Sequence, residues 1–306
     1  MASRLFPLVL TTLVALAGCQ QKPAAVADTS SPDASVRAAV AGLKTGDLRT
    51  LVTAQVPPAE LVRLREKWKL ERASKPITDA DRKQFAEMMA SLTAPNAETE
   101  LYGKLDPQLT KMETEFAAQV PIWIDLGRGI AEHTIKSSKE MTEAQKQEAI
   151  KSVDSIAKWA ASIKFTDREQ AKRTIAVTCR VARELKLKTL DEARALEFDP
   201  ALDKFSIVFR GLKEVLANYG LSLDRVLDTV KTETLAQAGD TAKVAVSYQL
   251  LDAPIRYEAE MIRLDGRWYG KDAIERLRKP KTGVPEISGE EPEPEAAEPA
   301  PDGNPG

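Results

Sequence analysis

Few residues of this chain have the types and spacing that acid–base, nucleophilic or metal chemistry requires. The chain has a single histidine, His133, and two cysteines, Cys19 and Cys179. A histidine-based catalytic or metal site needs partners at a defined spacing, such as a second histidine four residues away, and His133 has none. Cys179 lies among apolar residues at helical spacing, a pattern typical of a buried small hydrophobe. We therefore predict no catalytic residue, no metal ligand and no cofactor.

Pairs of carboxylates are the remaining candidates for chemistry. Glu258 and Glu260 share one face of a predicted strand, and Asp125 and Glu132 share a predicted helix. Glycosidase-like chemistry needs two carboxyl groups that face each other across a cleft. Because the chain holds 46 acidic residues, such pairs arise by chance, and a cell-envelope hydrolase is the least favoured function.

The N-terminus carries the most specific pattern. A positive start at Arg4 is followed by an apolar run and then by Leu16-Ala17-Gly18-Cys19. The run of about 12 residues is shorter than the roughly 20 that a membrane-spanning helix needs. The order of charge, apolar run and small residues therefore predicts a secretory signal peptide over residues 1–18 that is removed.

Leu16-Ala17-Gly18-Cys19 resembles the lipobox of bacterial lipoproteins. The resemblance implies that Cys19 becomes the acylated first residue of the mature chain and holds it at a membrane. Gln20, in place of an aspartate, implies sorting to the outer membrane, facing the periplasm. The alternative is an ordinary signal peptide cleaved after Ala15 or Ala17, which would release the protein.

Composition divides the remainder into four parts. Residues 19–31 are polar and predict a flexible tether, whereas residues 279–306 combine prolines with acids and predict a disordered tail. Residues 32–185 predict a helical region, and residues 186–278 predict helices followed by a sheet. The net charge of −2 is close to neutral and gives no indication of a nucleic-acid partner.

Helix starts are marked by capping residues. Ser31-Pro32-Asp33, Asp106-Pro107 and Asp199-Pro200 each place proline just after a capping side chain. Capping boxes are predicted at Thr78, Thr142, Thr166 and Thr189. Pro121 predicts a break near Val120, and Gly220 predicts a left-handed end to the helix that begins at Pro200.

After residue 228 the apolar period changes from helical to alternating. Residues 230–271 predict an antiparallel meander of about four strands, with turns at Gly239-Asp240, Asp252-Ala253-Pro254 and Asp265-Gly266. A short helix from Asp272 to Arg278 follows. The predicted fold class is α+β and predominantly helical.

The strand that opens with Gly-Asp-Thr-Ala-Lys-Val-Ala-Val and the one that closes with Asp-Gly-Arg-Trp-Tyr resemble the C-terminal half of NTF2-like domains. The likeness covers residues 185–278 and leaves the helical region before it unmatched. NTF2-like domains serve as enzymes and as binding modules, so the resemblance implies a fold and no single function.

The sequence favours a membrane-anchored, non-catalytic module that binds an envelope or periplasmic protein, either as an immunity or inhibitor protein or as an envelope accessory factor. Tyr257, Trp268 and Tyr269 are its predicted contact surface. The alternative is a carrier of a small apolar ligand, with a pocket lined by Phe205, Phe209, Tyr248 and Met261.

Overall fold

The computed structural model describes residues 28–74 and 76–278. The predicted signal peptide, Cys19 with most of the tether, and the acidic tail lie outside the described residues. In the described part of the chain, no helix combines the length and the apolar character that crossing a membrane requires.

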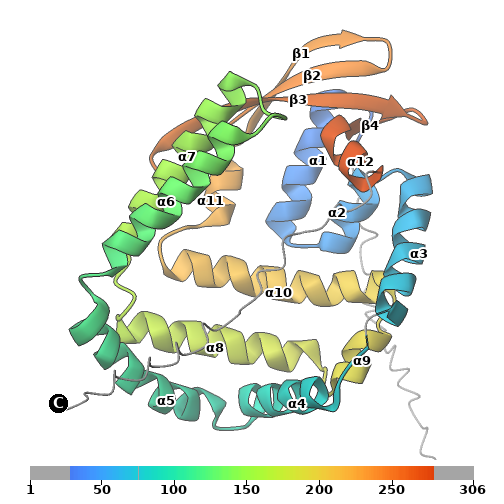
Figure 1. Cartoon of the computed structure of the whole chain (residues 1–306). Coiled ribbons are helices and arrows are strands. Elements are labelled where there is room, and N and C mark those ends of the chain that lie inside the picture. Colours follow the sequence, from blue (N-terminus) through green and yellow to red (C-terminus); the bar gives the residue numbers. More distant parts are fainter. Residues whose placement is uncertain (1–27, 75, 279–306) are drawn as a thin grey trace, which may run out of the picture.

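The predominantly helical α+β fold is confirmed, with helices that precede a sheet (Figure 1). In chain order the elements are α1 (Pro32–Thr45), α2 (Leu48–Gln55), α3 (Pro58–Ser74), α4 (Asp79–Thr93), α5 (Ala97–Lys111), a π-helical turn (Met112–Phe116), α6 (Val120–Ser137), α7 (Glu143–Ser162), α8 (Arg168–Leu185), α9 (Leu190–Ala195), α10 (Phe198–Asn218), α11 (Leu223–Asp228), β1 (Lys231–Ala238), β2 (Thr241–Leu250), β3 (Ala253–Leu264), β4 (Arg267–Gly270) and α12 (Lys271–Arg278).

The sheet is the antiparallel meander that the alternating pattern predicts, with strand order β1-β2-β3-β4. Asp265 and Gly266 both have positive φ, of 50° and 77°, as a two-residue hairpin turn between right-twisted strands requires. Gly239 has φ 57° in the β1–β2 turn. Leu251 also adopts a positive φ, of 56°, in the β2–β3 turn, which contains no glycine.

The core lies between the sheet and the helices. Val244, Val246 and Trp268 share one sheet face and pack with Val36 of α1. A second cluster, formed by Leu250, Ile255 and Leu221 with several half-buried residues, joins β2 and β3 to the loop after α10. Because α1 packs on the sheet and α8 on α10, contacts cross the predicted boundary at residue 185.

Most predicted helix starts are confirmed. Ser31 caps α1, and complete capping boxes form at Thr78, Thr142 and Thr189. The break near Val120 is also confirmed, since α6 begins there after a turn. Gly220 has φ 93° just beyond the end of α10.

Two predicted starts are wrong and one is displaced. Pro107 lies inside α5, where the Asp106 carboxylate accepts hydrogen bonds from the Tyr102 hydroxyl (3.0 Å) and from Arg168 Nε (3.2 Å) instead of capping a helix. The cap of α8 is Asp167 and not Thr166. The helix α10 begins at Phe198, just before the predicted Asp199-Pro200 start. At Asp106, a tertiary partner, Arg168, thus binds the side chain that the local pattern assigns to a helix cap.

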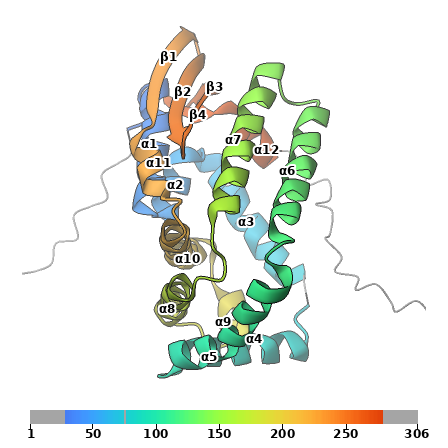
Figure 2. The same cartoon turned by 90° about the vertical axis from the view of Figure 1, so that its left-hand side faces the viewer.

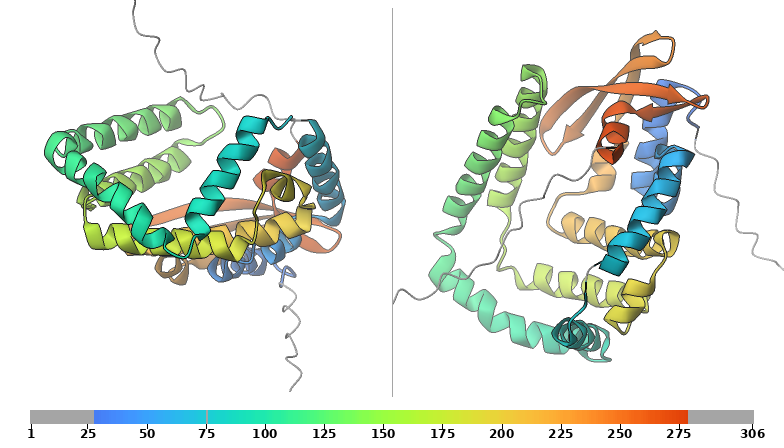
Figure 3. Two further views of the ribbon diagram at one scale, coloured as in Figure 1. Left: turned by 90° about the horizontal axis from the view of Figure 1, so that it is seen from below. Right: turned by 45° about the vertical axis from the view of Figure 1, so that its right-hand side comes forward.

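The helices form an open frame below the sheet (Figure 1). The helices α10 and α8 run side by side across it, with the α6–α7 pair at one side, α3 at the other, and α4 with α5 at the end far from the sheet. Figure 2 shows α1, α2, α10 and α8 as one layer, with α3 and α6 on the same side of that layer. Seen from below in Figure 3, the α6–α7 pair and α4–α5 likewise stand on one side of α8 and α10.

Candidate binding surface

The predicted contact surface on the sheet requires a correction. Tyr257 is 41% exposed, but Trp268 is 1% and Tyr269 0% exposed. The short strand β4 contacts both α1 and α12, so both of its aromatic side chains are buried. Of the three predicted contact residues, Tyr257 alone is available to a partner.

The four residues predicted to line a pocket do not converge. Phe205 packs edge-on against Trp68 of α3, with ring centroids 6.2 Å apart, whereas Met261 belongs to the sheet core near α1. Phe209 lies next to Gly46, between α1 and α2, and Tyr248 packs in the second core cluster. A shallow cavity of about 390 Å³ opens beside the β1–β2 hairpin and shares only Met261 with the predicted set. These side chains fill separate parts of the core and surface.

An exposed apolar row on α10 is the feature that the sequence analysis missed. Phe205, Val208 and Leu212 are 48%, 44% and 49% exposed, and their spacing of three and four residues places them on one helix face. The sequence analysis placed Phe205 in a predicted pocket and singled out neither Val208 nor Leu212. The helix is apolar on more than one face, and its neighbours α2 and α8 cover the other faces. The one sequence signal for an exposed row was that α10 carries more apolar residues than a single helix face can hold.

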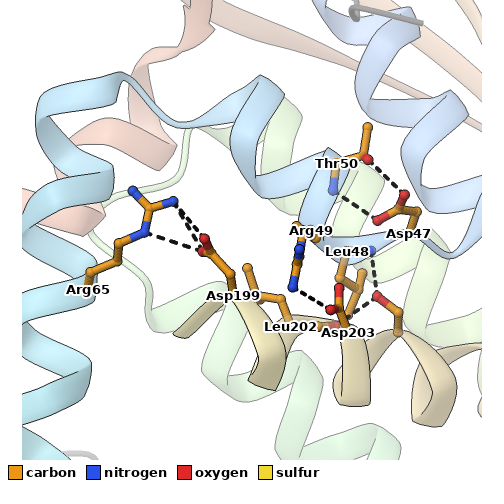
Figure 4. A network of polar contacts seen from close by, with 9 residues as sticks. Asp47, Leu48, Arg49, Thr50, Arg65, Asp199, Leu202 and Asp203 are labelled. Carbon is orange, nitrogen blue, oxygen red and sulfur yellow. Dashed lines mark hydrogen bonds and ion pairs between the residues drawn. The ribbon is translucent and has the colours of Figure 1, made fainter. Parts of the chain in front are cut away.

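The row is held on a firmly positioned helix (Figure 4). Asp199 receives a bidentate hydrogen bond from the Arg65 guanidinium of α3, at 3.1 Å to each carboxylate oxygen. One turn further, Asp203 pairs with Arg49 of α2. The Ser206 hydroxyl accepts a hydrogen bond of 2.9 Å from the backbone amide of Leu48, in the first turn of α2. Three contacts along one side of α10 thus fix its rotation, and with it the direction of the apolar row.

The row faces the open side of the frame, which is the side of the α1–α2–α10–α8 layer on which α3 and α6 lie (Figure 2). Phe205 contacts Trp68, and Figure 2 shows α3 on the same side of α10 as α6. Tyr257 lies on the sheet face that packs on the helices, because the register places it opposite Val246. Tyr257 stacks edge-on with Tyr248 at 6.4 Å, and burial raises the pKa of its hydroxyl. The exposed apolar groups thus lie on α10 and on the helix-facing side of the sheet.

The chemistry-bearing residues are dispersed. Cys179 is fully buried, as predicted, and burial raises the pKa of its thiol. His133 is exposed on α6. Glu258 and Glu260 share the outer sheet face and pair with Lys243 at 3.8 Å and Lys271 at 2.7 Å, respectively.

The ion pair with Lys271 lowers the pKa of Glu260, opposite to the raised value that a general acid needs. Within residues 28–74 and 76–278, no group of three His, Cys, Asp or Glu side chains is placed to hold a metal ion. The arrangement supports non-covalent binding of apolar groups.

Comparison of the chain with models of protein families, with curated proteins and with solved structures gives no match. The resemblance of residues 185–278 to NTF2-like domains stays a prediction.

Proposed function

We propose that the protein is a lipid-anchored, non-catalytic module of the bacterial envelope that binds another protein through the open side of its frame. The observation that carries this proposal is the exposed row of Phe205, Val208 and Leu212 on a helix whose rotation is fixed by polar contacts along another side. Large apolar side chains that stay exposed together, rather than singly, mark interaction sites. Tyr257 adds an aromatic group with a polar tip, the type enriched at the centres of protein interfaces.

The anchor supports the same proposal from the other end of the chain. Thr29 is 4% exposed, and its carbonyl accepts the Trp268 amide at 3.1 Å while its hydroxyl accepts Arg267 Nε at 2.9 Å. Only residues 20–28 separate Cys19 from Thr29, and these ten residue-to-residue steps span at most about 35 Å when fully extended. Acylation of Cys19 would therefore keep the sheet end of the molecule close to the membrane, where an envelope protein is the available partner.

The test is site-specific photocrosslinking of the full chain in its own envelope. A photoreactive phenylalanine at position 212 should form one dominant adduct with an envelope protein. The matched control is position 233, because Glu233 is exposed and pairs with Ala245, which places it on the outer sheet face. Equal yields of adduct from positions 212 and 233 would exclude the α10 row as the binding site.

Charged substitutions test the same surface without a probe. Val208→Asp and Leu212→Asp should fold normally, since both side chains are about half exposed, and should lose the adduct from a probe at position 257. An unchanged adduct in both variants would contradict the proposal. A co-purified small apolar molecule in place of a protein adduct would favour the carrier function instead.

A further inference from the structure

The helix α6 has two apolar faces, and only one of them is covered. Ile124, Ala131 and Ile135 are half-buried on the side that packs on α7. The other face presents large apolar side chains that are each at least half exposed: Ile122 63%, Trp123 50%, Leu126 61% and Ile130 60%. Together they expose on the order of 400 Å², the size at which a surface patch of a monomer is often functional.

No charged side chain lies in this face. The charges of α6 recur at Asp125, Arg128, Glu132 and Lys136, three or four residues apart, along a different side of the helix. They are satisfied within the chain, since Arg128 pairs with Asp125 at 3.6 Å and with Asp154 of α7 at 3.3 Å, and Lys136 pairs with Glu132. Covering the apolar face would therefore bury no unpaired charge.

Two glycines border the same face. A Cβ atom added to Gly127 or Gly129 would meet no atom within 4 Å, so no packing within the described chain requires a glycine at either position. Glycine in a helix interior is destabilising relative to alanine, and it permits close approach of another element. The two positions are explained if something packs directly on α6.

The face is symmetric about Leu126. Ile122 and Ile130 lie four residues to either side of it, and Gln119 and His133 lie seven residues to either side. A two-fold axis through Leu126 would place Ile122 against Ile130 of a second copy, Gln119 against His133, and the large Trp123 against Gly129. Such self-complementarity is what an isologous dimer interface requires.

The face is also accessible. Among the described elements, α7 is the one that α6 contacts extensively, and Figure 2 shows α6 at the outer edge of the molecule. The polar side of α6 balances two acids with two bases, whereas helices that lie on anionic membranes are rich in bases. A second copy of the chain fits these observations better than a lipid surface.

We propose that two copies of this protein associate through α6, with the helices antiparallel about a two-fold axis at Leu126. This contact uses a surface separate from the α10 row, so it is independent of the proposed function. In a membrane-anchored dimer the two frames would present two partner surfaces at once.

Disulfide trapping in the full chain tests the proposed axis. Leu126→Cys, oxidised in its own envelope, should give a disulfide-linked dimer at least about 10-fold faster than the matched control, because a two-fold axis brings the two sulfur atoms together. The control is Leu70→Cys on α3, an apolar position that is 68% exposed. Cys179 is fully buried and sets no competing background. Equal rates for the two variants would overturn the proposal.

Sedimentation of the detergent-solubilised full chain supplies a second measurement. Leu126→Glu should weaken the dimer by roughly 100-fold or more, since like charges would face each other at the axis, while Leu70→Glu should leave it intact. An unchanged dimer in Leu126→Glu would overturn the proposal. A monomeric parent chain would also overturn it. A blue shift of tryptophan fluorescence on phosphatidylglycerol vesicles that Trp123→Phe abolishes would then assign the face to lipid.

Discussion

At the scale of single residues, ion pairs join helices that are distant in sequence. Glu98 at the start of α5 receives a bidentate hydrogen bond from Arg183 of α8, at 2.6 and 2.9 Å. The Arg183 contact lowers the pKa of Glu98 from 4.5 to about 2. Both side chains are more than a third exposed, so water and salt screen the pair. Its clearest consequence is therefore a pH dependence.

We expect Glu98→Gln to reduce the acid sensitivity of folding. A carboxyl group with a lowered pKa in the folded state contributes stability above its unfolded value of 4.5, and this contribution is lost as the pH falls toward about 2. Denaturant unfolding at a series of pH values should show a shallower fall in unfolding free energy over that window for Glu98→Gln. Glu100→Gln is the control, because Glu100 lies in the same helical turn and contacts Asn96 instead. Parallel curves for Glu98→Gln and the parent chain would contradict the assignment.

At the scale of elements, α8 and α10 approach closely because Gly211 has no side chain. A Cβ atom there would lie 2.3 Å from Val181 Cγ2, which is too close for any contact. Valine is stiff about its first side-chain torsion, so Val181 has little room to turn away. This contact sets the spacing between the two helices that cross the frame, and hence the position of the α10 row.

Gly211→Ala should destabilise the protein by about 1–2 kcal/mol, because overpacking outweighs the gain in helix propensity. Gly103→Ala in α5 is the matched control, since its Cβ would meet nothing within 4 Å. That variant should be more stable than the parent by about 0.5–1 kcal/mol. Urea unfolding of the two variants measures both effects, and a stabilised Gly211→Ala would show that the helices can separate without cost.

At the scale of the whole molecule, the chain consists of a body, formed by the sheet and the other helices, and an arm formed by α6 and α7. The α6–α7 arm is joined to the body through α7, where Trp159 Nε1 donates to the Tyr219 carbonyl at 2.7 Å and the Arg256 amide donates to Glu148 at 3.0 Å. The second bond gives the Arg256 amide an acceptor in the part of β3 that pairs with β2 but not with β4. It thereby protects an exposed edge of the sheet. The arm is therefore fixed to the rest of the molecule through α7.

Cys19→Ala tests where the whole molecule resides. Acylation requires the Cys19 thiol, so the variant should lose metabolic labelling with palmitate and accumulate as unprocessed precursor. Cys179→Ala is the matched control and should keep the label, because Cys179 is buried in the core. Palmitate label that persists in Cys19→Ala would rule out the lipid anchor at this residue.

The sequence by itself determined the local features of the protein. Capping side chains at Ser31, Thr78 and Thr142, and the alternation that marks β2 and β3, act over a few neighbouring residues, so the helix starts and the meander could be predicted. The burial of Cys179 followed in the same way from its apolar neighbours at helical spacing.

The tertiary structure alone decided which of the large apolar side chains on β4 and α10 are buried. Trp268 and Tyr269 were expected on the surface and lie in the core, whereas Phe205 was expected to line a pocket and is half exposed on α10. Hydrophobic pattern shows that a residue prefers an apolar environment, but the neighbour that supplies this environment comes from far along the chain. For β4 those neighbours are α1 and α12, and for the α10 row and the outer face of α6 the described chain supplies none that covers them.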